Sequence, residues 1–115
     1  MTPLSPRALA QLFEEAQDLH QAGRLGEALE RYKRILAANP QHGPALHMTG
    51  LLAFQNGQNE LAINLMTSAR QAGDVSAVLH SNLGLALRAA GRTDEAVASF
   101  RRALSLKPDT AETHN

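Results

Sequence analysis

The sequence contains no cysteine and no tryptophan, and aromatic residues occupy only 3% of its 115 positions. The lack of cysteine excludes disulfide bridges, thiolate nucleophiles and cysteine-based metal centres. The 11 basic and 11 acidic side chains balance, so no long-range field would attract nucleic acid or an anionic membrane. No apolar run approaches the roughly 20 residues of a membrane-spanning helix, and the first residues do not resemble a signal peptide. We therefore expect a cytoplasmic chain that binds neither nucleic acid nor membrane.

One pattern recurs at intervals of 34 residues along the chain. Alanine occupies one column of this pattern: Ala28, Ala62 and Ala96. Glycine stands five residues before each of these alanines: Gly23, Gly57 and Gly91. A fixed period of this length indicates one supersecondary unit stacked on copies of itself. The sequence therefore predicts a single domain, 1–115, with repeats 9–42, 43–76 and 77–110, and residues 111–115 as a tail or the start of a truncated further repeat.

Each repeat is predicted to form two helices. Apolar residues follow helical spacing, as at Leu79, Leu83 and Leu87. The glycine column falls where the first helix should end, because glycine adopts the left-handed conformation without a Cβ clash. A column of small residues, Ala16, Gly50 and Gly84, should let the alanine column of the second helix approach closely. A column of large residues, Tyr32, Met66 and Phe100, should fill the space between neighbouring hairpins.

Several residues are predicted to mark the ends of helices. Ser5-Pro6 and Gly43-Pro44 resemble helix starts, with proline at the first helical position. Asn59 and Thr93 are predicted to cap the second helices of repeats two and three. Pro40 and Pro108 should end the second helices of repeats one and three, because proline lacks the amide hydrogen that a helix needs.

Repeat three resembles the tetratricopeptide repeat in His80-x-x-Leu83-Gly84-x-x-Leu87, followed by Ala96, Phe100 and Pro108. The resemblance extends over residues 9–110 and is weakest in repeat two, where Asp74 stands at a position that favours proline in the family. It implies an all-α fold, a right-handed α-solenoid of three helix-turn-helix hairpins. It also implies a non-catalytic, protein-binding role for the concave groove that the first helices would line.

The register of the family assigns nine residues to this groove, where we expect a peptide or a partner helix. They are Phe13, Gln17, His20, His47, Leu51, Phe54, Asn82, Leu85 and Arg88. The apolar members predict a pocket for anchor residues of the partner. An alternative is that Phe54 turns inward and fills the space beside Ala53. The basic carboxylate clamp of some relatives is absent at the corresponding positions.

The five histidines do not predict a metal site. They form no His-Glu-x-x-His motif and have no carboxylate at a helical spacing that would complete one. No base stands beside a nucleophile at a meaningful spacing either. We therefore expect no cofactor and no catalytic residue.

Two alternative functions remain open. Asn82 lies where protein O-GlcNAc transferase-like arrays carry asparagines that hold the substrate backbone, so the chain could be the substrate-presenting arm of a larger glycosyl- or sulfotransferase. In the second alternative, Val97, Phe100 and Leu104 form an uncapped apolar surface through which the C-terminal repeat pairs with a second copy.

Overall fold

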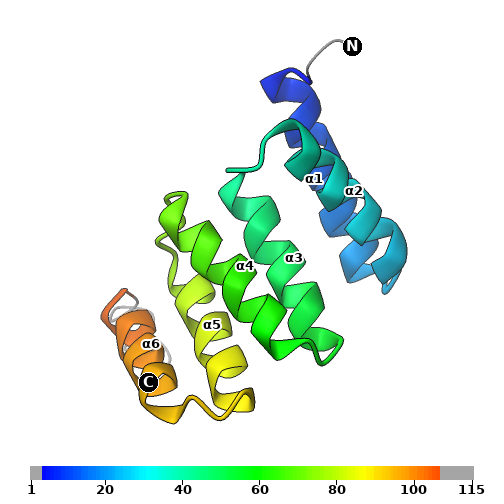
Figure 1. Cartoon of the computed structure of the whole chain (residues 1–115). Helices are drawn as coiled ribbons and strands as arrows, with labels where there is room; N and C mark the ends of the chain where they lie inside the picture. Colours follow the sequence, from blue (N-terminus) through cyan, green and yellow to red (C-terminus); the bar gives the residue numbers. More distant parts are fainter. Residues whose placement is uncertain (1–3, 107–115) are drawn as a thin grey trace, which may run out of the picture.

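The structure, a computed structural model, describes residues 4–106 (Figure 1). This region folds into six α-helices and contains no strand. The helices pair in chain order into antiparallel hairpins, α1 with α2, α3 with α4, and α5 with α6. Their bounds are α1 Pro6–Gln21, α2 Leu25–Ala38, α3 Gly43–Gln55, α4 Asn59–Gln71, α5 Ala77–Ala89 and α6 Thr93–Leu106. The predicted all-α solenoid of three hairpins is confirmed.

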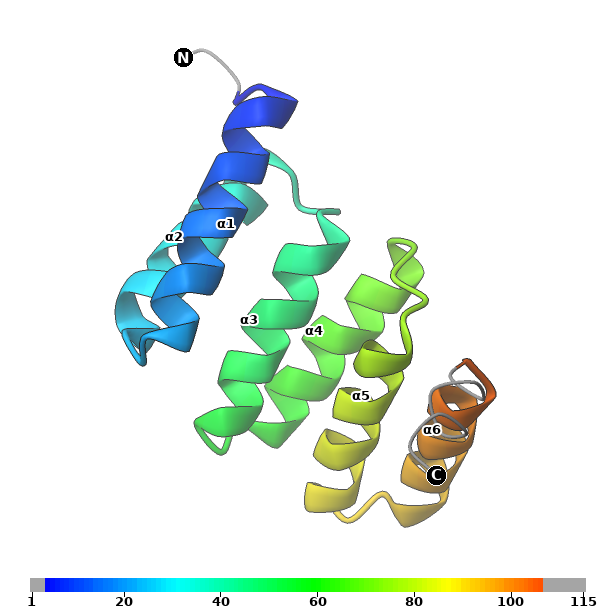
Figure 2. The same ribbon diagram turned by 180° about the vertical axis from the view of Figure 1, so that it is seen from behind.

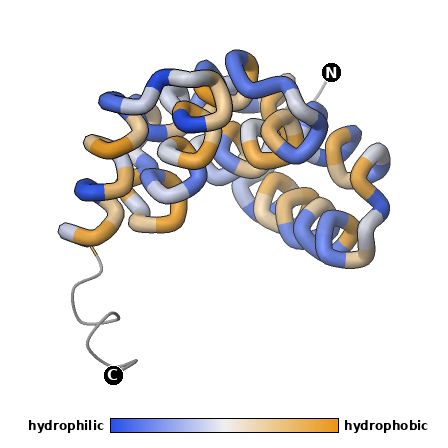
Figure 3. Tube along the Cα trace, turned by 90° about the horizontal axis from the view of Figure 1, so that it is seen from below, coloured by the Kyte–Doolittle hydropathy of each residue, from blue (hydrophilic) through white to orange (hydrophobic). Residues whose placement is uncertain are grey.

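The first helices, α1, α3 and α5, and the second helices, α2, α4 and α6, form two layers of the stack (Figures 1 and 2). Between hairpins, α3 packs on α2 and α5 packs on α4. Apolar and polar stretches alternate along the helical trace (Figure 3), as amphipathic helices require when each buries one stripe against its neighbours. The layer of first helices is therefore a continuous surface built from three separate parts of the chain.

The glycine column ends the first helix of each hairpin, as predicted. Gly23, Gly57 and Gly91 have φ angles of 80°, 79° and 81°, in the left-handed region where a Cβ would be strained. Arg24 N then donates to Leu19 O at 2.9 Å, which satisfies a carbonyl at the end of α1.

Two predicted helix starts are confirmed, and both predicted caps, Asn59 and Thr93, are wrong. Ser5 precedes α1 and accepts from Ala8 N at 3.1 Å, and Pro44 is the second residue of α3. Asn59 is instead the first residue of α4, preceded by Gln58 at the cap position without a side-chain bond. Only Gln58 lies between Gly57 and α4, so the helix begins one residue earlier than a cap at Asn59 requires.

The remaining predicted helix ends have different outcomes. Helix α2 ends at Ala38, two residues before Pro40. Helix α6 begins at Thr93 itself, so Thr93 does not occupy the predicted cap position before the helix. Arg92 occupies that position and forms an ion pair at 2.8 Å with Glu95 in the first turn. Pro108 and the tail 111–115 lie outside the described residues.

The core consists of two apolar clusters that meet in the middle of the stack. The first cluster contains Leu12, Ala16, Ala28, Tyr32, Ile35, Ala45 and Leu52. The second contains Leu46, Ala53, Ala62, Ile63, Met66, Ala69, Leu79, Leu83, Ala86, Leu87 and Ala96. Each cluster spans two hairpins, so the stack buries its apolar stripes only by packing repeat on repeat.

The small column accommodates the large column of the same hairpin. A Cβ added to Gly84 would lie 2.7 Å from the Phe100 ring, and one added to Gly50 would lie 2.8 Å from Met66 Cγ. Gly50 also approaches the backbone of the alanine column, because the added Cβ would lie 3.3 Å from Ala62 O. The large side chains therefore fill space inside their own hairpins as well as between hairpins, which the sequence did not predict.

Candidate peptide-binding face

The nine predicted groove residues lie on the layer of first helices, in stripes at helical spacing of three or four. Gln17 and Arg88 are exposed, and His47 is buried with only 5% of its surface accessible. The other six are partly buried: Phe13, His20, Leu51, Phe54, Asn82 and Leu85. No described contact with a partner tests their role, so the groove remains a prediction.

Three apolar members of the set also support the core. Leu51 and Phe54 pack against the second cluster, and Phe13 packs against the first. The Phe13 ring lies 5.9 Å from the Tyr32 ring between centroids. Phe54 therefore packs inward while part of its surface stays accessible. Substituting these three side chains would disturb folding as well as any binding.

A hollow of about 670 Å³ opens at the N-terminal end of α3. Phe13 from α1 lies on one side and the loop between α4 and α5 on the other. The apolar part of its lining is Phe13, Pro44, Met48, Ala72 and Val75, and the polar part includes His47 and Asp74. Of the nine predicted groove residues, only Phe13 and His47 line this hollow. It has the size and mixed lining of a site for an apolar side chain with nearby hydrogen bonds.

The sequence prediction missed Pro44, Met48 and Val75 as lining residues. One signal was available, because Asp74 replaces the proline that the family favours before this loop. The loop between α4 and α5, which contains Asp74, places Val75 beside the groove. The Val75 side chain is 64% exposed and therefore available for contact. Val78, one turn before Asn82 on α5, is 51% exposed.

Histidine-to-amide hydrogen bonds connect neighbouring first helices at both junctions between hairpins. His20 Nε2 lies 3.2 Å from Gln55 Oε1, joining α1 to α3 at an exposed position. His47 Nε2 lies 3.0 Å from Asn82 Nδ2, joining α3 to α5 at a partly buried one. Each pair is separated by 35 residues in the sequence. The two junctions therefore use similar chemistry in different surroundings.

His47 is held on its second nitrogen by a carboxylate. Its Nδ1 lies 3.2 Å from Asp74 Oδ2, and the side chains of the pair are 6% and 14% exposed. Burial lowers the pKa of His47 below its ordinary value, and the nearby Asp74 charge and hydrogen bond partly oppose that shift. The imidazole is therefore kept neutral near pH 7.

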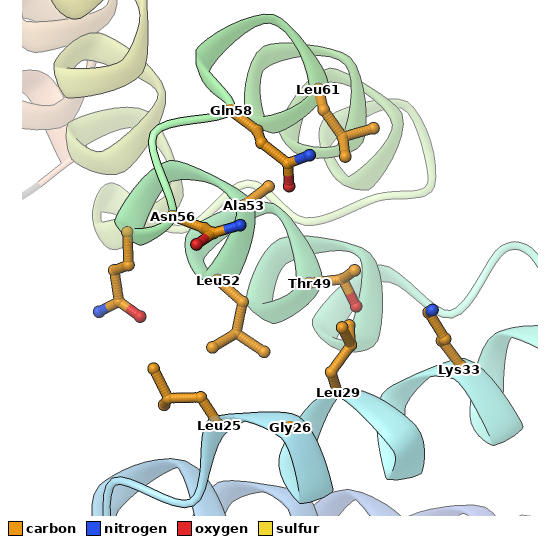
Figure 4. Close-up of a pocket in the computed structure, with 11 residues that line it drawn as sticks. Leu25, Gly26, Leu29, Lys33, Thr49, Leu52, Ala53, Asn56, Gln58 and Leu61 are labelled. Atoms are coloured by element: carbon orange, nitrogen blue, oxygen red, sulfur yellow. The ribbon is translucent and has the colours of Figure 1, made fainter.

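A second groove lies between α2 and the α3–α4 hairpin, and the sequence analysis did not predict it. Its volume is about 530 Å³. Leu25 and Leu29 from α2 face Leu52 from α3 across it, with Leu61 of α4 at its edge (Figure 4). Leu25 and Leu61 are 41% and 46% exposed. We call this the outer groove. It opens on the side of the stack formed by the second helices, so it is separate from the predicted groove on the first helices.

Within residues 4–106, no group of three or more histidine, aspartate or glutamate side chains is arranged to hold a metal ion. In the same region, no helix has the length and apolar character needed to cross a membrane.

Known proteins match this chain along most of its length. It is 33% identical over 93 residues to Protein FlbA of Caulobacter vibrioides, which covers 81% of this chain and 16% of FlbA. It is 29% identical over 104 residues to human Tetratricopeptide repeat protein 7A, covering 90% of this chain and 12% of that protein. The chain therefore spans less than a fifth of these two relatives.

Solved structures share its fold. A mutant of Thermobaculum terrenum O-GlcNAc transferase superposes with a TM-score of 0.88 at 30% identity, over 95% of this chain and 21% of that one. The second TPR of Spaghetti, bound to an HSP90 peptide, superposes with a TM-score of 0.80 at 19% identity, over 86% of this chain and 92% of that one.

The model of a tetratricopeptide repeat family matches residues 13–77 and again 47–111. These overlapping matches are offset by 34 residues, the period of the glycine and alanine columns. Together with the three stacked hairpins, they show that the chain belongs to the tetratricopeptide repeat family.

Proposed function

We propose that this chain is a protein-interaction module that binds an extended, mainly uncharged segment along α1, α3 and α5. The observation that carries the proposal is the charge pattern of this layer. Helix α3, at its centre, has no aspartate, glutamate, lysine or arginine among its 13 positions, and Arg88 is the one such residue in α5. Helix α1 carries Arg7, Glu14, Glu15 and Asp18. The largely uncharged surface of α3 and α5 favours a partner that buries apolar side chains over one held by ion pairs.

The exposed part of this face provides contacts for such a segment. Val78 and Leu85 lie on one side of α5, and Phe13 and Met48 line the hollow beside α3. An apolar side chain of the partner would enter the hollow, and each 100 Å² of apolar surface removed from water contributes about 2.5 kcal/mol before ordering costs. The Spaghetti structure, with its bound HSP90 peptide, is a precedent for peptide binding by this fold.

We infer binding and not catalysis for this face. A buried histidine held by a carboxylate resembles the base of a hydrolase, which would use its second nitrogen to take a proton. In this chain that nitrogen, His47 Nε2, is already hydrogen-bonded to Asn82 at 3.0 Å. The pair therefore links two helices and has no nitrogen left to activate a nucleophile.

The test is a peptide selection followed by a matched pair of substitutions. Peptides from a random displayed library would be selected on the wild-type chain, synthesised and measured by fluorescence anisotropy. Val78→Asp should weaken binding about tenfold or more, because the charge would be desolvated under the peptide. Leu61→Asp, at a residue of similar exposure in the outer groove, is the control and should leave the affinity unchanged.

Circular dichroism would verify that both variants remain helical. If Leu61→Asp abolished binding and Val78→Asp did not, the site would lie in the outer groove of Figure 4 and the proposal would be wrong.

A second candidate is that these repeats form the substrate-presenting arm of a larger transferase. The likeness to the O-GlcNAc transferase structure, 30% identical over 95% of this chain, favours it. Sequencing the complete reading frame of the gene is the test. A transferase domain in the same reading frame supports this candidate, and a reading frame without one eliminates it.

We also propose that a second copy of the chain covers α6. Val97 is 41% exposed, whereas Ile63, at the same position of the preceding repeat, is 4% exposed beneath α5. Leu104 on α6 is 66% exposed. Asp94 and Glu95 lie in the first turn of α6, and Arg101 and Arg102 lie in its second half, so an antiparallel pair of α6 helices would bring opposite charges together.

Sedimentation velocity at several concentrations would test this dimer. The wild-type chain should dimerise and Leu104→Asp should remain monomeric. A monomeric wild type at the highest concentration would exclude the dimer.

A further inference from the structure

His47 lies at the centre of a hydrogen-bonded chain that connects three elements. Its Nδ1 lies 3.2 Å from Asp74 Oδ2 in the loop after α4, and its Nε2 lies 3.0 Å from Asn82 Nδ2 on α5. Asp74 is itself fixed, because its Oδ1 accepts from Ser76 N at 3.0 Å. The carboxylate position therefore does not depend on a bound partner.

The chemistry of these groups decides where the protons lie. An ionised carboxylate only accepts hydrogen bonds, so the Nδ1 nitrogen of His47 must carry the hydrogen that bonds Asp74. In a neutral imidazole the other nitrogen, Nε2, then has a lone pair and accepts. Asn82 must therefore donate a hydrogen bond from its Nδ2–H group to His47 Nε2, which turns the carbonyl oxygen Oδ1 of Asn82 away from His47.

The Asn82 side chain is partly buried, and its carbonyl oxygen is not among the fully buried atoms that lack a partner. Among residues 4–106, no hydrogen bond engages Asn82 Oδ1, and the one fully buried side-chain polar atom without a partner is Tyr32 Oη. Asn82 shares a face of α5 with Val78 and Leu85. A fixed acceptor thus stands on an otherwise apolar strip.

We infer that His47 and Asp74 are positioning residues that hold the Asn82 carbonyl oxygen toward the groove, where it accepts a hydrogen bond from a backbone N–H of the bound segment. The peptide part of this inference rests on the function proposed above. A backbone N–H suits this role, because every extended segment carries such donors whatever its side chains.

Protonation of His47 reverses the orientation of the amide. With hydrogens on both nitrogens, the ring presents Nε2–H to Asn82, and two donors would face each other. The carboxamide then rotates so that Oδ1 accepts from His47 and the NH₂ group faces the groove. Asp74 is the charged group that acts on His47, while Phe13 of α1 and Asn82 of α5 add no charge. Acidification therefore turns an acceptor for the peptide into a donor.

The pair formed by His20 and Gln55 is a natural control. It has the same separation of 35 residues, but it is exposed, and its bond runs in the opposite direction, because Gln55 Oε1 only accepts and His20 Nε2 therefore donates. Within residues 4–106, no carboxylate holds the other ring nitrogen of His20. The amide of Gln55 should therefore exchange between orientations.

Nuclear magnetic resonance of the ¹⁵N-labelled chain tests the positioning without any peptide. Near pH 7, His47 should be the Nδ1–H tautomer and show a scalar coupling across the hydrogen bond to Asn82 Nδ2. The coupling should vanish as His47 is protonated, and the pair of His20 and Gln55 should show none. An Nε2–H tautomer of His47 near neutral pH, or a missing coupling to Asn82, would overturn the inference.

Asp74→Asn keeps the size of the side chain and removes the requirement for Nδ1–H. We expect mixed tautomers of His47 and a weaker coupling to Asn82. An unchanged spectrum would show that Asp74 does not position the ring.

A peptide selected on the wild-type chain adds the functional measurement. Its affinity should fall about three- to tenfold as His47 is protonated, which corresponds to the loss of one hydrogen bond. His20→Gln should keep the same pH profile. An affinity independent of the protonation of His47 would refute the role of Asn82 in binding. Failure to select any peptide would refute the proposed function, while the spectra would still decide the positioning of Asn82.

Discussion

The two junctions between neighbouring hairpins are built from the same repeat, but their helices pack together with different tightness. At the first junction, α3 packs on α2 beside a groove of about 530 Å³, and Leu25 remains 41% exposed. At the second junction, α5 packs on α4 beside a smaller groove of about 330 Å³, and Leu79 and Met66 are fully buried. The repeat pattern therefore sets how hairpins stack, while individual side chains set how tightly they close.

The two junctions also differ in how completely their buried polar groups are hydrogen-bonded. The first has the exposed bond of His20 to Gln55, and it leaves the buried hydroxyl of Tyr32 without a partner. The second satisfies both nitrogens of His47 beneath the surface. An unpaired buried polar atom costs free energy, so the first junction carries a cost at Tyr32 that the second junction avoids at His47.

Truncating one leucine at each junction should give the largest effect and test the difference in packing. Leu79→Ala should lower the free energy of unfolding by roughly 3 to 5 kcal/mol, since its neighbours surround it completely. Leu52→Ala should cost roughly 2 to 3 kcal/mol, because Leu52 already borders the outer groove. Urea titrations would measure both values. Equal losses would mean that the two junctions are packed equally well.

Removing the amide from each histidine pair should have a smaller effect. Asn82→Ala leaves the Nε2 atom of His47 buried without a partner and should cost about 1 to 3 kcal/mol. Gln55→Ala removes an exposed bond, so its cost should be below about 0.5 kcal/mol. The same denaturant titrations measure the pair. A larger loss for Gln55→Ala would contradict the difference in burial.

Removing one hydroxyl group should stabilise the first junction. Burial raises the pKa of Tyr32 to about 12, and its Oη has no partner within residues 4–106. Tyr32→Phe keeps the ring that packs on Phe13 and removes the unpaired atom, so we expect a gain of about 1 kcal/mol. A higher thermal midpoint in calorimetry would agree. A loss of stability would show that the hydroxyl is hydrogen-bonded in solution.

Mild acidification should have the smallest effect. Burial lowers the pKa values of His47, His80 and His42 below the ordinary 6.5. Between about pH 7 and pH 6, the unfolded chain therefore takes up protons that the folded chain does not, and stability falls by a few tenths of a kcal/mol per histidine. Urea titrations at both pH values would measure the change. Stability that rises on acidification would contradict the direction of these shifts.

The family register located the surface on which the candidate site lies, but not the state of each side chain. It placed His47 among polar residues lining the groove, and the structure buries that ring between Asp74 and Asn82. The partner Asp74 lies 27 residues away in a loop, so no local pattern connects the two. Hydrogen bonds between repeats depend on the distance and rotation of one hairpin relative to the next, which periodicity does not specify.

The sequence by itself determined the number of hairpins, their order and the place where each turns. These features follow from local rules, because glycine alone adopts the left-handed conformation without strain at positions such as Gly57, and helical spacing fixes the stripe that each helix buries. Only the tertiary structure decided which junction packs more tightly, that the His47 ring is buried, and that the Asn82 carbonyl oxygen has no hydrogen bond among residues 4–106. Those outcomes depend on the fit between side chains from different repeats, and that fit appears only when the hairpins are stacked.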